Sequence, residues 1–221
     1  MADHMIKLKE VPKGQKMQFL WDYYRYPALG AVIGIILVVS LVKTIFFTPK
    51  ADINVIFTTR ISLSEDDGKK FDEAVNNALE DYNGDNKRLA EITRLAYDAE
   101  SSGSDIQYSQ AVLTKINVEL AAGDAILQFC DDKLYPIYEN GGCVASYKVF
   151  DDFGVEINHK NDGDAVKIPL SSIKAFSDIK SPDGEEIYLT VRTPMEKWYK
   201  NEKEKENYTN HLKYIAKLVN E

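Results

Sequence analysis

The longest apolar run of the chain lies near its N-terminus and predicts a membrane-spanning helix. Residues 27–47 read PALGAVIGIILVVSLVKTIFF, and Lys43 is their one charged residue. At about 1.5 Å per residue, this run is long enough to cross the hydrocarbon core of a bilayer. Aromatic residues gather on both sides of it, as in the interfacial belts of membrane proteins. We therefore expect residues 27–47 to lie in the lipid bilayer, with Pro49 preventing continuation of the helix.

The basic residues beside this run predict its orientation. Five Lys or Arg residues precede it, whereas only Lys43 and Lys50 lie at its far end. Because basic residues are retained on the cytoplasmic side, residues 1–26 are expected in the cytoplasm. The apolar core is followed by KTIFFTPK, which has no small-residue cleavage pattern, so we expect an uncleaved signal anchor. The chain is thus predicted to be a single-pass protein of the cell membrane, with residues 51–221 as an extracytoplasmic domain.

Beyond the apolar run, polar and apolar positions first alternate and then recur at helical spacing. Residues 52–58 (DINVIFT) read as a largely buried strand. A helix is expected from Ser64, whose side chain suits an N-cap and is followed by three acidic residues. We expect this helix to end at Asn83-Gly84. Its apolar positions form one stripe: Phe71, Val75, Ala78, Leu79 and Tyr82.

The same alternation occurs twice more before residue 142. A strand is expected within residues 88–97, followed by a helix from Ser104, a capping-box position, to Gly123. Residues 125–130 read as a short buried strand, and a further helix is expected after it, ended by residues 140–142. Alternating strands and helices imply right-handed crossovers. The predicted fold class is therefore α/β, a mostly parallel sheet flanked by helices.

The remainder of the chain is expected to contain shorter elements around residues 155–157, 165–170 and 186–192. A long charged helix completes it. Its apolar stripe is formed by Tyr208, Leu212, Ile215 and Val219.

The charge distribution bears on the partners of the outer domain. The chain has 27 Lys or Arg residues and 35 Asp or Glu residues, of which 20 and 32 respectively follow residue 50. Such an acidic surface repels phosphate backbones, which argues against nucleic acid as a partner.

One stretch resembles a known family. Residues 115–130 (KINVELAAGDAILQFC) are similar to a segment of extracellular solute-binding proteins, in which a helix ending in a Leu-x-Ala-Gly-Asp turn leads into a strand of the first lobe. The closer similarity is to uncharacterised membrane-anchored proteins of Gram-positive bacteria, which share an aromatic juxtamembrane stretch such as residues 21–26 (WDYYRY). Solute-binding proteins hold their ligand between two lobes. The resemblance implies a single, periplasmic-binding-protein-like lobe here, because the outer domain is too short for a pair.

No motif for catalysis, a metal or a cofactor stands out. His4, His159 and His211 have no spacing typical of a metal site or a catalytic triad, and His211 is expected on a polar, solvated helix face. Nucleophile-elbow, zinc-protease and phosphate-loop motifs are absent from the sequence. We therefore expect a protein that is not an enzyme and that needs no cofactor.

Two cysteines, Cys130 and Cys143, fall in the domain expected outside the cytoplasm. Disulfides persist there, so the pair can form a bridge. Two small buried apolar side chains are the alternative, and the sequence does not decide between them.

Candidate ligand-binding residues follow from the predicted strand order. Open α/β sheets bind ligands at the carboxyl ends of their strands. These ends carry Thr58, Thr59 and Arg60 after the first strand, and Asp131 and Asp132 after the third. The alternative is that these residues only start loops and cap helices; Asp131 and Asp132 suit the cap of the helix after them.

Two functions fit these observations. The first is a non-catalytic, membrane-tethered binding or interaction module with protein partners at the cell surface. The alternative is a small-molecule sensor or receptor that uses the solute-binding-like lobe, in a form that dimerises to complete the cleft.

Overall fold

The computed structural model describes residues 14, 16–47, 50–98, 105–158, 164–179 and 181–220. Contacts divide the chain into two units, Met1–Pro49 and Lys50–Glu221.

The first unit contains the single helix α1 (Lys16–Phe47). Its stretch Arg25–Thr44 has a mean hydropathy of 2.1 and none of its most apolar window is buried within the protein. This helix is long and apolar enough to span a membrane, which is compatible with the predicted anchor. It begins well before residue 27, and Pro27 lies inside it. Proline removes one backbone donor but keeps a helical φ, so a long helix can continue through it when the surroundings satisfy the freed carbonyl.

The second unit is built on a five-stranded sheet with the order β2-β1-β3-β5-β4. Its strands are β1 (Ile53–Thr59), β2 (Ala90–Ala96), β3 (Leu127–Asp131), β4 (Ile168–Pro169) and β5 (Ile187–Val191). β1 pairs in parallel with both β2 and β3, whereas β5 is antiparallel to β3 and to β4. The prediction of a mostly parallel sheet is therefore correct only for the first three strands. Ile187, the first residue of β5, pairs with Asp131, the last residue of β3, so β5 runs back antiparallel to β3. The described residues between these two strands contain no long helix that would return the chain to the other end of the sheet.

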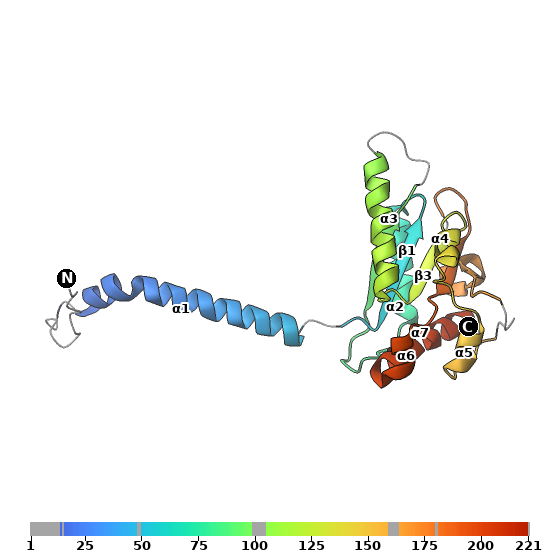
Figure 1. Ribbon diagram of the computed structural model, residues 1–221. Helices are drawn as coiled ribbons and strands as arrows, with labels where there is room; N and C mark the ends of the chain where they lie inside the picture. Colours follow the sequence, from blue (N-terminus) through green and yellow to red (C-terminus); the bar gives the residue numbers. More distant parts are fainter. Residues whose placement is uncertain are drawn as a thin grey trace. The chain divides into compact units, whose positions relative to one another are not determined.

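Helices cover both faces of this sheet (Figure 1). On one face, α2 (Glu65–Ala78) and α7 (Glu202–Asn220) pack against β1 through the larger apolar cluster. On the other face, α3 (Asp105–Ala122) and α4 (Tyr135–Asn140) pack against β1 and β3 through a smaller cluster. Short helices α5 (Lys148–Asp152) and α6 (Glu196–Lys200) and two 3-10 turns, Leu170–Ser172 and Lys174–Phe176, complete the unit.

Four phenylalanines form the centre of the larger cluster. The ring of Phe71 on α2 lies 4.7 Å from that of Phe57 on β1 and 4.9 Å from that of Phe129 on β3, both edge to face. Phe176 closes the group, 5.5 Å from Phe71. Edge-to-face pairs add to the free energy of burying the rings. This cluster fixes α2 against the first and third strands.

The helix α2 is shorter than its apolar stripe predicts. Ser64 caps it as expected, its Oγ accepting the Asp67 N–H at 3.1 Å, but the helix ends at Ala78 and Leu79 is extended. Buried Asp52 accounts for the difference. Its Oδ1 accepts the N–H groups of Tyr82 and Asn83 at 2.8 and 3.0 Å. These bonds hold the segment after α2 in an irregular conformation, since a carboxylate can satisfy donors that a helix would otherwise use.

Several other expected elements differ in detail. Residues 155–157 form no strand, although Val155 and Ile157 are buried. Residues 165–170 contain an isolated β-bridge from Ala165 to Ser146, the two-residue β4 and the start of a 3-10 turn. The expected N-cap at Ser104 lies outside the described residues, whereas Gly123 ends α3 with a φ of +77° as predicted.

Candidate functional site

The carboxyl ends of β1 and β3 meet at the point where the strand order reverses. The chain passes from β1 to β2 on one side and returns to β3 on the other. Such a reversal is where open α/β sheets place ligands. The predicted residues Thr58, Thr59, Arg60, Asp131 and Asp132, which we call the strand-end cluster, lie at this point.

The two threonines of the strand-end cluster are turned into the protein. Thr58 is buried, and its Oγ1 lies 2.6 Å from the hydroxyl of Tyr138 on α4. Thr59 is also buried, and its Oγ1 donates a hydrogen bond to the carbonyl of Ile61 at 2.8 Å. Both hydroxyls therefore hold neighbouring elements in place.

Asp131 joins the loops that follow the two strands. Its Oδ2 accepts the backbone N–H of Arg60 at 2.5 Å, and its Oδ1 accepts that of Leu134 at 2.9 Å. Burial raises the pKa of the Asp131 carboxyl, while these backbone donors oppose the rise. The prediction that Asp131 caps the following helix is wrong, because the N-cap of α4 is Leu134 and has no side-chain hydrogen bond. Asp131 is the last residue of β3 and binds the turn before α4. Arg60 places its Nε 3.4 Å from Oδ2 of Asp183.

Asp132 forms a second connection at the same edge and does not cap α4. Its Oδ1 accepts a hydrogen bond from Lys167 at 3.0 Å. The Lys167 ammonium also lies 4.3 Å from the ring centre of Tyr135 and 4.1 Å from that of Tyr188, close enough for cation–π attraction. The structure therefore brings Arg60 and Asp131 together and gives each member of the strand-end cluster an internal contact. That these residues bind a ligand stays a prediction.

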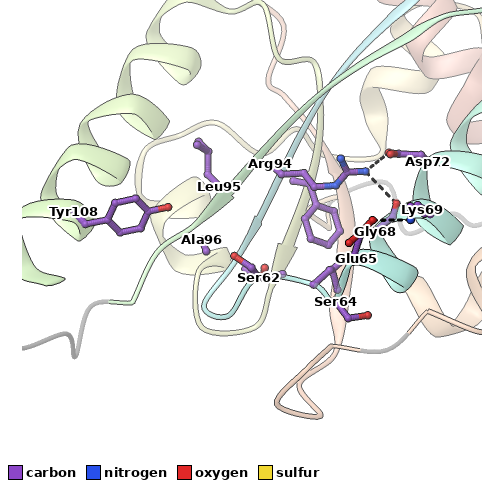
Figure 2. Close-up of a pocket in the computed structure, with 13 residues that line it drawn as sticks. Ser62, Ser64, Glu65, Gly68, Lys69, Asp72, Arg94, Leu95, Ala96 and Tyr108 are labelled. Atoms are coloured by element: carbon purple, nitrogen blue, oxygen red, sulfur yellow. Dashed lines mark hydrogen bonds and ion pairs between the residues drawn. The ribbon is translucent and has the colours of Figure 1, made fainter.

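A groove lies beside this cluster, at the carboxyl end of the edge strand β2 (Figure 2). Its volume is about 330 Å³. The loop after β1 contributes Ser62 and Ser64, α2 contributes Lys69, β2 contributes Arg94, and α3 contributes Tyr108. We call this feature the edge groove. In a parallel strand–helix–strand unit, the end of β2 and the start of α2 lie at the same end of the sheet, which is why these residues meet.

Charges in the edge groove are balanced. Arg94 forms an ion pair with Asp72 and donates to the carbonyl of Gly68 at 3.2 Å, and Lys69 pairs with Glu65 at 2.7 Å (Figure 2). Exposed pairs of this kind contribute little stability, so they can exchange partners at low cost. The groove offers hydroxyls, paired charges and the exposed ring of Tyr108, which suits a polar or peptide ligand better than a strongly charged one.

Two features of the sequence point to this groove. Ser64 suits the start of a helix and residues 88–97 suit a strand, and parallel pairing of the strands then implies that Ser64 lies near Arg94. The exposed Tyr108, in contrast, has no sequence signal beyond an aromatic residue near the start of a helix.

His211 corrects one expectation about histidines. It lies on α7 but is only 1% exposed, so the expectation of a polar, solvated helix face is wrong. Its Nε2 accepts the Asn54 backbone N–H at 3.0 Å, and Nδ1 lies 2.7 Å from the Asn207 carbonyl. Burial lowers its pKa to about 4. The sequence contains a signal for this burial. His211 is three residues after Tyr208, so on a helix it lies next to the apolar stripe.

The described part of the chain shows neither a metal-binding cluster nor a disulfide bond. Within it, no group of three or more His, Cys, Asp or Glu residues is arranged to hold a metal ion. Cys130 and Cys143 are both free thiols, the first buried and the second partly exposed.

No protein-family model, curated protein or solved structure matches this chain. The similarity to solute-binding proteins therefore rests on sequence stretches alone. The class that the structure defines is a mixed α/β domain preceded by one apolar helix of membrane-spanning length.

Proposed function

We propose that this chain is a membrane-anchored, non-catalytic interaction module that contacts a protein partner outside the cytoplasm through the edge groove. The observation that carries the proposal is the groove itself, about 330 Å³ at the end of an edge strand. In this proposal α1 holds the domain at the cell membrane, with residues 1–26 in the cytoplasm, as the distribution of basic residues favours.

Exposed apolar side chains near the groove support a protein partner. Tyr108 is 62% exposed, Ile106 precedes it on the first turn of α3, and Ile61 precedes the groove residue Ser62. Exposed apolar groups gathered at one place are typical of interaction surfaces. β2 adds a further feature, because within the described residues its one strand neighbour is β1. An extended segment of a partner can pair with such an edge.

The same region favours an alternative, a small-molecule sensor with a one-lobe solute-binding-like fold. A volume of about 330 Å³ lies at the lower end of the range for small-molecule pockets. The non-catalytic part of both proposals is supported by His211, the one histidine among the described residues, because both its ring nitrogens are engaged and it is buried.

Site-specific photocrosslinking in the source cells tests the protein-partner proposal. A photoreactive phenylalanine analogue replaces Tyr108 in one strain and Tyr199, an exposed tyrosine on α6, in a matched control. A discrete protein adduct at position 108 and none at position 199 is expected. No adduct at position 108, or the same adducts at both positions, contradicts the proposal.

A thermal-shift screen of the full chain in detergent micelles tests the sensor alternative. A metabolite that raises the melting temperature of the wild-type chain, but not that of a groove-filling Ser62→Trp variant, would support it. A flat screen for a well-folded chain counts against it.

A further inference from the structure

A partly exposed thiol lies against a buried guanidinium at the end of the sheet opposite to the strand-end cluster. Cys143 follows α4, and its Sγ is 3.6 Å from Nη1 of Arg192, the residue after β5. The Sγ also lies 3.4 Å from the carbonyl oxygen of Gly141. The two backbones are joined as well, because the N–H of Thr193 donates to the Cys143 carbonyl at 3.1 Å.

Arg192 is held firmly but lacks an anionic partner. Arg192 is only 8% exposed. Within the part of the chain that the structure describes, its Nε has no hydrogen-bond partner. Its backbone N–H donates to Ile126 at 2.9 Å, and its carbonyl accepts the Tyr208 hydroxyl at 2.5 Å. Within the described residues, no carboxylate lies within ion-pair distance of this guanidinium. A buried charge without a counter-ion is costly, so negative charge at the neighbouring sulfur is favoured.

The ionisable side chains of α4 nearest to Cys143 in the sequence are those of Tyr138 and Glu139. Tyr138, in the same cluster, has its phenol buried and bonded to Thr58, and burial raises the pKa of that phenol. Glu139 lies in the last turn of α4 and is exposed.

We propose that Cys143 is a thiol-modification site that reacts with low-molecular-weight disulfides, with Arg192 stabilising its thiolate. The thiolate is the reactive form of cysteine, and a neighbouring cation favours it. In the step, the Cys143 sulfur attacks one sulfur of the disulfide and forms a new S–S bond. The original S–S bond breaks, and its electron pair leaves with the second sulfur as a thiolate, which takes up a proton from water. Residues outside the cytoplasm encounter such disulfides.

Cys130 provides an internal control. It is fully buried on β3, and burial raises the pKa of its thiol. It is therefore expected to stay unmodified while the chain is folded.

The first test treats the full chain in detergent micelles with 2,2′-dithiodipyridine, an uncharged disulfide whose leaving group absorbs light. One equivalent is expected to react in the folded chain and a second only after unfolding in urea, with peptide mass spectrometry locating the first at Cys143. Folded Cys143 is also expected to react faster at pH 7 than the same residue in the unfolded chain. Modification of Cys130 first, or slower reaction of folded than of unfolded Cys143, overturns the proposal.

The second test measures the role of Arg192 from the pH dependence of that rate. Arg192→Gln is expected to slow the reaction about tenfold at pH 7, and the difference is expected to shrink as the pH rises, because the cation beside the sulfur then matters less for the amount of thiolate. Arg192→Lys keeps the charge and is expected to restore most of the rate. Lys213→Gln, which removes an exposed charge on α7, is the matched control and should leave the rate unchanged. Equal rates for wild type and Arg192→Gln at pH 7 overturn the proposal, and the comparison of folded with unfolded wild type decides the matter if the variant does not fold.

Discussion

The Nε2 of His211 accepts a hydrogen bond from the backbone N–H of Asn54 at 3.0 Å, and this bond joins the last helix of the chain to its first strand. The ring needs a proton on Nδ1, which donates to the Asn207 carbonyl at 2.7 Å, and none on Nε2. The neutral tautomer is therefore built into the fold, and protonation removes the acceptor on which this contact depends.

The stability of the unit Lys50–Glu221 should fall as the pH decreases through the titration of His211. Its pKa is lowered from 6.5 to about 4 by burial. Below pH 6.5 the unfolded chain therefore binds a proton at this histidine, whereas the folded chain binds it only below about pH 4. The free energy of unfolding therefore falls as the pH decreases from 6.5 to 4. The difference amounts to roughly 3 kcal/mol. Urea unfolding at pH 7.5 and pH 4.5 measures it, and His211→Gln should show a smaller pH dependence. Equal pH dependence in both chains would contradict this assignment.

Asp52 should be among the most important polar residues for folding. It is buried, and its two carboxylate oxygens accept N–H groups from Tyr82, Asn83 and Leu89. Removing the carboxylate leaves these donors with fewer partners, so Asp52→Ala is expected to lower the free energy of unfolding by roughly 3 kcal/mol. Chemical denaturation of the full chain in micelles measures the change. Glu206→Ala on the exposed side of α7 is the control and should change stability by less than about 0.5 kcal/mol.

Asp131 should act on stability more than Arg60 does. Asp131→Ala leaves the N–H groups of Arg60 and Leu134 without their acceptor and is expected to cost roughly 2 kcal/mol. Arg60→Ala removes a partly exposed ion pair with Asp183 but keeps the backbone N–H that binds Asp131, and it should cost less than about 1 kcal/mol. Thermal and urea unfolding compare the two variants. A stable Asp131→Ala chain would mean that this carboxylate is kept for a purpose other than joining the loops.

The orientation across the membrane can be tested in intact cells. A cysteine introduced at exposed Lys213, in a chain with Cys143→Ser, should react with a membrane-impermeant maleimide without cell lysis. A cysteine introduced at Ala2 should react only after lysis, because the distribution of basic residues predicts a cytoplasmic location for that end. The reverse pattern would show that the domain faces the cytoplasm.

Local pattern was sufficient for much of the architecture. A continuous apolar run predicts a helix of membrane-spanning length whatever surrounds it, and α1 has that length. Alternation predicted β1, and helical spacing with Ser64 and Gly123 predicted one end each of α2 and α3. The carboxyl ends of parallel strands lie at the same end of a sheet, whatever the side chains are. The order of the predicted strands was therefore sufficient to predict that Arg60 and Asp131 lie close together.

Tertiary structure decided what depends on residues distant in sequence. The end of α2 is set by Asp52, 30 residues before Tyr82, and the burial of His211 by Asn54, 157 residues away. The direction of β5, the edge groove and the contact of Cys143 with Arg192 likewise arise only when separate segments pack together. By itself the sequence determined which segments are apolar and which can be helices or strands, because those properties are local. The partner of each buried polar group was decided by packing, because periodicity and propensity along one segment contain no information about which other segment will supply a donor or an acceptor.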